Sequence, residues 1–243
     1  MHPCLNVDEI VRLIAGKLIE SKTNATAIAL ACCCQSFEDP ALDALWGTQD
    51  KLLPLLKSLP GDVWNEGGCT VSVSTTRSYI YTQTNNTRFL FPQLFVRKSF
   101  KRSPTTLEWA RFRKYARRMR ELKECWTSNT LSSAVFSVLQ LCAIGEPLLP
   151  NLKTLDLWHI TGKSIPFIPL FLSPRTTIIK IRFIPSNSVT ATVAPMVTAF
   201  LALCPSLQEI SLHSLRRDPV IIAAVSKMLL RGNRNALRCF NAD

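Results

Sequence analysis

The sequence contains few of the residues on which catalytic and metal sites depend. It has only three histidines, and neither His159 nor His213 lies at a triad or metal-motif spacing from a cysteine, serine or carboxylate. Its eight glycines form no phosphate-binding loop, and no Cys-x-x-Cys pair is followed by a second pair. We therefore expect no catalytic residue, no metal site and no cofactor, and we predict that the chain is not an enzyme.

The sequence also lacks an uninterrupted apolar segment long enough to cross a membrane. A spanning helix needs about twenty predominantly apolar residues, whereas the uncharged stretch 188–204 is shorter and contains Pro195 and three threonines. This stretch predicts a buried helix that begins near Pro195. Asp8 and Glu9 stand where a secretory signal would have its apolar core. We expect no membrane partner and a reducing compartment, the cytoplasm and/or the nucleus.

The nine cysteines are scattered without paired spacing, as is typical of a chain that is kept reduced. Cys32, Cys33 and Cys34 are consecutive. Neighbouring positions on a helix point about 100° apart, so these three thiols cannot converge on one zinc ion. They are predicted to be small buried residues of a helix.

Three short helices are predicted within the first fifty residues. In the last of them Asp39 suits the N-cap and Pro40 the first turn, before the sequence P-A-L-D-A-L-W ends at Trp46. So short a bundle has a small core, which predicts that Leu45 and Trp46 remain available for an interface. Apolar residues at helical spacing predict the two earlier helices: Ile10, Leu13, Ile14 and Leu18, then Ile28, Ala29, Cys32, Cys33 and Phe37.

A leucine pattern recurs in the second half of the chain. Two copies follow a proline closely, a third has diverged and two are fainter. Their central positions, 122, 155, 181, 210 and 240, are separated by 33, 26, 29 and 30 residues, close to the period of about 20 to 29 residues of leucine-rich repeats. The copies are Leu152, Leu155 and Leu157; Leu207, Ile210 and Leu212; Ile178, Ile181 and Phe183; Met119 and Leu122; Leu237 and Phe240.

The segments between these copies are predicted to be helices, so that the units stack into a short solenoid. Leu131 to Cys142 carries an apolar stripe that stops before Gly145, and a second helix is expected from Asp218 to a stop at Gly232. The fold class that follows is mixed α/β (α+β).

Residues that alternate with the buried leucines and isoleucines are predicted to lie on the opposite face of each strand. Their mixed chemistry could bind a protein partner, with Trp158 as an anchor; a Trp158 that folds back over the edge of the repeat is equally compatible. The predicted face consists of Thr154, Asp156, Trp158, Lys180, Arg182, Glu209, Ser211 and His213.

The net charge of +12 is concentrated in one segment. Arg97 to Lys123 holds eleven Lys or Arg against Glu108 and Glu121. The pattern predicts an amphipathic helix from Glu108 to Leu122 with a basic exterior. Such a face could bind a polyanion such as nucleic acid. We favour the alternative that the basic face is solvated, so we do not expect nucleic acid as a partner.

Two segments depart from the repeat pattern. Residues 67–91 have no helical stripe, and a structureless loop of that length is uncommon in compact domains. We interpret them as an insertion, with retained untranslated sequence as one source. The chain also stops at Asp243, just after a repeat strand begins, which predicts a truncated repeat domain without its terminal cap.

The chain resembles fungal (basidiomycete-type) F-box proteins with leucine-rich repeats. The similarity lies in C-L-N-V-D-E-I-V-R-L-I from Cys4, A-L-A-C-C-C-Q-S-F from Ala29 and P-A-L-D-A-L-W from Pro40, and continues from Leu52 to Trp64 and from Glu108 to Leu122. One departure is that Val7 and Asp8 occupy the places where F-boxes commonly carry Leu-Pro. The resemblance implies that an N-terminal three-helix F-box at residues 1–60 binds a Skp-family adaptor and, through it, a cullin. The residues predicted to face or support that adaptor are Leu5, Val7, Ile10, Leu13, Ile14, Leu30, Phe37, Leu45 and Trp46.

The same resemblance implies a variable linker or insertion at 61–107 and a short, irregular leucine-rich-repeat domain at 108–243. The expected function is substrate recognition in a Skp-cullin-F-box ubiquitin ligase, for ubiquitin-dependent degradation of an unknown protein. Two alternatives remain: a repeat scaffold that binds a partner outside any ligase, and a basic nucleic-acid-associated protein.

Overall fold

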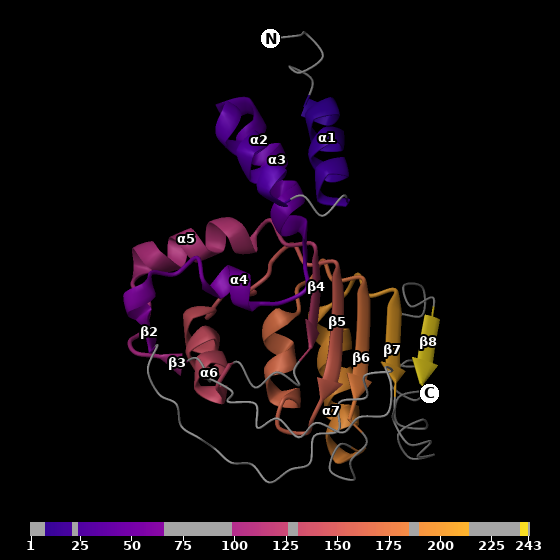
Figure 1. The fold of residues 1–243 in the computed structure, drawn as a ribbon. Coiled ribbons are helices and arrows are strands. Elements are labelled where there is room, and N and C mark those ends of the chain that lie inside the picture. The colour runs from indigo at the N-terminus through magenta and orange to yellow at the C-terminus, as the bar shows by residue number, and fades with distance from the viewer. Residues whose placement is uncertain are drawn as a thin grey trace, which may run out of the picture.

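The chain folds into three N-terminal helices joined to a mainly parallel sheet that carries helices on one face (Figure 1). This architecture is mixed α/β, as predicted. The computed structural model describes residues 8–20, 24–65, 99–125, 131–184, 190–213 and 239–242.

The N-terminal bundle consists of α1 (Asp8–Glu20), α2 (Asn24–Cys33) and α3 (Gln35–Gly47), and the three helices pack against one another. Its buried apolar residues are few and mostly small: Val11, Ala15, Ala27, Phe37 and Ala41. A core of this size stabilises little on its own, because the hydrophobic contribution scales with the apolar area removed from water.

The predicted start of the third helix is wrong. Helix α3 begins at Gln35, after an extended Cys34 with φ −161° and ψ 159°, so Pro40 lies inside the helix and Asp39 is not its N-cap. The first turn forms upstream because the Phe37 ring is buried in the bundle, and the Phe37 N–H donates to the Cys34 carbonyl at 3.0 Å. Tertiary packing here overrides a local capping preference.

The cysteine prediction is also wrong. Cys32 and Cys33 are exposed and Cys34 is half-buried. Helix α2 turns Ala27 toward the core instead, since the close approach of α2 to α3 leaves room there for a small side chain.

Six strands form one parallel sheet within the described residues, in the order β1-β4-β5-β6-β7-β8. The five strands expected from the leucine pattern are confirmed, and they lie side by side in chain order. The strands are β1 (Thr48–Gln49), β4 (Glu121–Cys125), β5 (Thr154–Ile160), β6 (Ile178–Phe183), β7 (Glu209–His213) and β8 (Cys239–Ala242).

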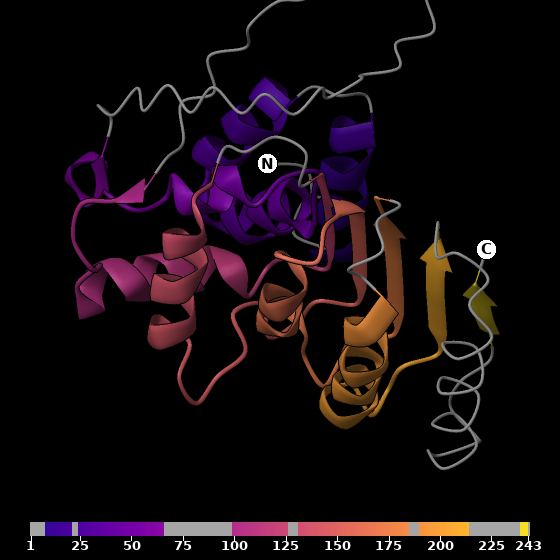
Figure 2. The same cartoon turned by 90° about the horizontal axis from the view of Figure 1, so that it is seen from below.

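Helical segments cover one face of this sheet, as the view from below in Figure 2 shows. They are α6 (Ser133–Cys142), the 3-10 helix η3 (Ile165–Phe171) and α7 (Thr190–Leu203). In strands β4 to β7 the side chains that point to this face, such as Leu155, Ile181 and Ile210, are buried against them. Helix α7 is the buried helix predicted from 188–204, although it starts before Pro195. In the described residues no helix is long and apolar enough to cross a membrane.

Helix α5 (Thr106–Ala116) begins with a capping box between Thr105 and Glu108 and ends six residues earlier than the sequence pattern predicted. Met119 and Leu122 are buried as expected, but Met119 lies in the turn after α5 and Leu122 in β4. Ala116, Met119 and Leu122 are spaced three residues apart and are all buried, so they look like a helical stripe in the sequence although the helix ends at Ala116.

Residues 48–105 connect the bundle to α5. This connection contains α4 (Leu53–Leu56), the 3-10 helix η2 (Gly61–Val63) and an antiparallel pair, β2 (Trp64–Asn65) with β3 (Ser99–Phe100). Asn65 pairs with Ser99, so the chain returns beside the point where it left. The expected insertion 67–91 and the expected helix 218–232 lie outside the described residues.

Candidate protein interfaces

The bundle exposes apolar side chains that its small core does not use. Leu13 and Ile14 of α1 are 69% and 39% exposed, and Ile28 of α2 is 51% exposed. The inward positions of these helices are taken by Val11, Ala15 and Ala27. Apolar residues grouped on one small domain are typical of an interface with another protein.

The other residues predicted to bind or support a partner at the bundle lie in mixed environments. Phe37 is buried and supports the core, whereas Ile10, Leu30 and Leu45 are half-buried. Leu5 and Val7 lie outside the described residues.

Trp46 contacts the chain's own α5. Its ring lies 5.0 Å from the ring of Tyr115, measured between centroids, and it packs against the core of the sheet unit. Trp46 is half-buried, so the expectation that it stays available for a second protein is corrected: only part of its side chain is accessible.

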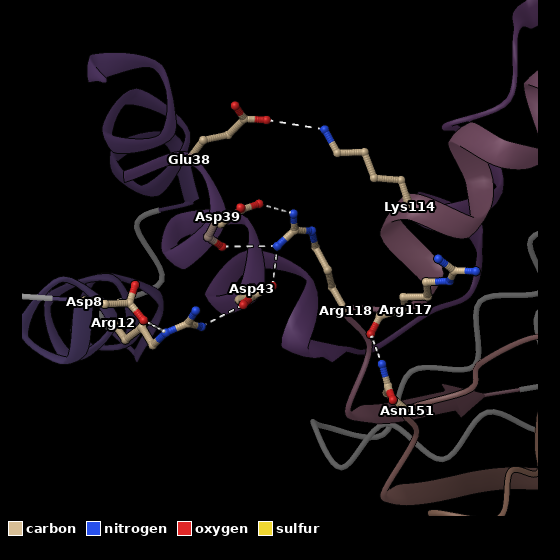
Figure 3. A network of polar contacts seen from close by, with 9 residues as sticks. All are labelled: Asp8, Arg12, Glu38, Asp39, Asp43, Lys114, Arg117, Arg118 and Asn151. Atoms are coloured by element: carbon tan, nitrogen blue, oxygen red, sulfur yellow. Dashed lines mark hydrogen bonds and ion pairs between the residues drawn. The ribbon is translucent and has the colours of Figure 1, made fainter. Parts of the chain in front are cut away.

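Arg118, directly after α5, joins the sheet unit to the bundle (Figure 3). Its side chain is 13% exposed and forms ion pairs with Asp39 and Asp43 of α3, and one NH group also donates to the Asp39 carbonyl at 3.2 Å. The Arg118 guanidinium holds the pKa of Asp39 below its ordinary value, chiefly through the hydrogen bond. Arg118 was predicted to lie on a basic exterior, so its contact with α3 was not expected.

The ion-pair network continues on both sides of Arg118. Arg12 of α1 donates to Asp8 and Asp43, each at 2.7 Å, and the hydrogen bond to Asp8 is the main reason that its pKa is raised. Lys114 lies 3.4 Å from Glu38. The bundle is therefore bound to α5 by charge contacts as well as by the Trp46 ring.

The uncovered face of the sheet carries aligned rows of polar side chains. The pairing places Glu121, Thr154, Ile178 and Glu209 in one row, and Lys123, Asp156, Lys180 and Ser211 in the next. Ile178 is the apolar member of its row; it was predicted as part of the buried leucine pattern, but Ile179 is the residue that is buried. Glu121 and Lys123 were missed as members of this face because Glu121 fell within the predicted amphipathic helix and Lys123 was counted only in the basic segment 97–123. The alternation around the buried Leu122 is the signal that could have identified them.

Some predicted residues of this face are engaged within it. Lys180 lies 3.5 Å from Glu209, and Lys123 lies 3.4 Å from Glu121. Ser211 is buried, with its hydroxyl 3.3 Å from the Glu209 carboxylate, so it is not accessible to a partner. Thr154 and His213 are half-buried.

Trp158 is the large apolar side chain on this face, and it is 38% exposed. Its indole N–H donates to Asp156 at 2.6 Å, and the Arg182 guanidinium of the next strand lies 4.3 Å from the ring centroid. These contacts keep Trp158 over the sheet rather than over its edge. A cation–π contact of this kind orients the plane of the Arg182 guanidinium and leaves its N–H groups able to donate to acceptors on a partner.

A bulge positions this tryptophan. The register between β5 and β6 shifts between Leu157 and Ile160, and His159 has a positive φ of 59°. Trp158 and His159 are both exposed as a result. Bulges of this kind redirect side chains and occur preferentially near binding sites.

Glu124 is a buried acid to which the sequence assigned no role. It points from β4 to the covered face of the sheet, where its carboxylate accepts the N–H of Leu52 at the start of α4. Burial raises the pKa of Glu124 to about 7, and the Leu52 hydrogen bond and Lys51 only partly oppose this.

No cluster of three or more His, Cys, Asp or Glu side chains that could hold a metal ion occurs in the described part of the chain. Comparisons of the sequence and structure with protein-family models, curated proteins and solved structures give no match.

Proposed function

We propose that the chain is a non-catalytic protein-binding subunit with two separate interfaces. Its N-terminal bundle acts as an F-box that docks on a Skp-family adaptor, which in turn binds a cullin. Its sheet, a short solenoid of leucine-rich-repeat units, recognises a target protein. The chain then holds the target beside the catalytic subunits of a ubiquitin ligase and raises the effective concentration of the target lysine.

The observation that carries this proposal is the exposure of three apolar side chains of the bundle, Leu13 and Ile14 of α1 and Ile28 of α2. The bundle is too small to bury these side chains itself, and each side chain covered by a partner contributes about 1.5–3 kcal/mol. The residue pattern from Cys4 to Trp46 supports the choice of a Skp-family adaptor as that partner.

The polar face of the sheet supports the target-binding part of the proposal. Trp158 and Arg182 are held in place by contacts within the sheet, so little side-chain entropy is lost when a partner contacts them. Tryptophan and arginine are also the side chains that most often dominate protein interfaces.

Co-purification with a Skp-family adaptor tests the proposal directly. The double variant Leu13→Asp/Ile28→Asp places charges in the proposed contact and is expected to weaken binding by about a hundredfold or more. The matched control is Leu107→Asp/Leu141→Asp, which alters leucines that are 84% and 68% exposed on α5 and α6. We expect this control to bind like the unmodified chain.

Two outcomes would contradict the proposal. One is that the unmodified chain forms no complex with the adaptor. The other is that both double variants bind it equally well. Circular dichroism of each variant establishes that the helices remain folded.

A repeat scaffold that works outside any ligase is the second candidate. Trp46 favours it, because a side chain expected at the adaptor is packed partly against Tyr115 of the same chain. The scaffold requires target binding at Trp158 without adaptor binding at Leu13, which the same co-purification distinguishes. The nucleic-acid alternative is weakened because Arg102, Arg113, Lys114 and Arg118 all pair with carboxylates.

A further inference from the structure

Basic side chains gather at the end of the sheet where the strands begin. We define this basic edge as Arg117, Arg120, Lys153 and Arg175, all of which are exposed. Arg120 and Lys153 directly precede β4 and β5, and Arg175 lies three residues before β6. Two of the four come from outside the basic segment 97–123, so the cluster is formed by the fold rather than by the sequence run.

Backbone and side-chain contacts bring the four residues together. The Lys153 N–H donates to the Arg120 carbonyl at 2.7 Å. Asn151 donates to the Arg117 carbonyl at 2.7 Å and accepts from the Arg175 guanidinium at 2.7 Å (Figure 3 shows the first of these). One amide therefore connects the backbone at Arg117 with the Arg175 side chain, and the backbone at Arg120 lies beside that at Lys153.

The charges of the basic edge are not neutralised within the described structure. None of its four residues forms an ion pair with a described residue. Arg118, which follows Arg117 in the chain, differs from them because it forms ion pairs with Asp39 and Asp43. Cations at the beginnings of neighbouring strands repel one another, and an anion placed among them relieves that repulsion.

The dimensions of the basic edge suit a peptide. Neighbouring strands are about 4.8 Å apart, so β4 to β6 span about 10 Å, which three to four residues of extended chain can cover. A nucleic acid fits less well, since no exposed aromatic side chain for base stacking lies in the described segments that precede these strands.

We propose that the basic edge is a docking site for a short acidic segment of a protein partner. This site is separate from the apolar surface of α1 and α2 and from the Trp158 face. It adjoins the C-terminal end of α3, because the Arg120 N–H donates to the Gly47 carbonyl at 2.8 Å. A protein that binds near the bundle can therefore reach it with an acidic loop.

Fluorescence anisotropy with the full chain tests this proposal. The probe is a labelled twelve-residue peptide that alternates glutamate and serine, measured in about 20 mM salt, where charge contacts are screened least. The variant Arg120→Gln/Lys153→Gln is expected to weaken peptide binding at least tenfold. The matched control, Lys57→Gln/Arg111→Gln, removes two exposed charges elsewhere that form no ion pair with a described residue, and it is expected to change binding less than twofold.

Further arms separate the competing explanations. The bundle variant Leu13→Asp is expected to bind the peptide normally, so failure of adaptor docking leaves this result intact. Equal weakening by both glutamine pairs would reduce the effect to net charge and overturn the proposal, as would an unmodified chain that does not bind the peptide. A single-stranded twelve-nucleotide oligothymidine that binds more tightly than the peptide, and is lost with Arg120→Gln/Lys153→Gln, would assign the site to nucleic acid and also overturn it.

Discussion

Replacement of Glu124 by glutamine is expected to change how stability depends on pH. The pKa of Glu124 is raised to about 7 in the folded chain by burial, against an ordinary value of 4.5. The folded state therefore binds a proton more tightly than the unfolded state does. The contribution of this group to stability is greatest below about pH 4.5, falls as the pH rises toward 7, and stays low above it.

The size of the effect follows from the shift. One pKa unit corresponds to about 1.4 kcal/mol, so a shift from 4.5 to about 7 amounts to about 3 kcal/mol of unfolding free energy. Glutamine keeps a carbonyl oxygen for the Leu52 N–H but carries no charge to desolvate. Its buried NH2 group costs about 1–3 kcal/mol at every pH. Relative to the unmodified chain, Glu124→Gln should gain about 2–3 kcal/mol between pH 5 and pH 8.

Urea unfolding followed by tryptophan fluorescence at pH 5, 6, 7 and 8 measures this difference. The comparison cancels every other titrating group that the two chains share. Glu121→Gln is the matched control, because it removes a carboxylate from the outer face of the same strand. A Glu124→Gln difference that stays constant with pH, or that moves toward destabilisation at high pH, would refute the burial argument.

Three further perturbations test how the fold is held together and how the sheet face is built. Arg118→Gln should lower the free energy of unfolding by about 1–3 kcal/mol and speed amide exchange in α3. Lys114→Gln, which breaks a more exposed pair, should lower it by less than about 0.5 kcal/mol. Equal effects would contradict the Arg118 clamp, by which we mean the ion pairs of Arg118 with Asp39 and Asp43. Phe112→Ala should cost about 3–5 kcal/mol in urea unfolding, since the ring is fully buried and stacks on Trp109 at 4.5 Å. Trp158→Ala should change stability by less than about 1 kcal/mol but abolish capture of the target, and normal capture would remove Trp158 from the proposed interface.

The sheet was predictable because its signal is local and repeated. Strands β5, β6 and β7 bury residues at the same register positions: Leu155 and Leu157, Ile179 and Ile181, and Ile210 and Leu212. Even the faint copy around Leu122 forms a strand. A repeated pattern succeeds because every unit meets the same packing problem.

The misses share a physical cause, which is contact between residues distant in the sequence. Arg118 pairs with residues 75 and 79 positions away, and nothing in its own segment distinguishes it from Arg117 or Arg120. Glu124 accepts a hydrogen bond from a residue 72 positions away. Local spacing cannot report such partners, so it could identify neither the clamp nor the buried acid.

These distant contacts determine how the two proposed interfaces are related. Helix α3 runs directly into β1, which pairs with β4, so the bundle and the sheet share a continuous backbone connection at Thr48. The Arg118 clamp and the Trp46–Tyr115 contact brace that connection from the side of α5. A chain with a flexible linker at this point would sample many separations between a partner on α1 and a ligand at Trp158. A braced chain holds one separation, and the effective concentration of a bound target at a second protein depends on that separation. Loosening of Arg118 is therefore expected to reduce target modification in the proposed ligase while both binding steps remain intact.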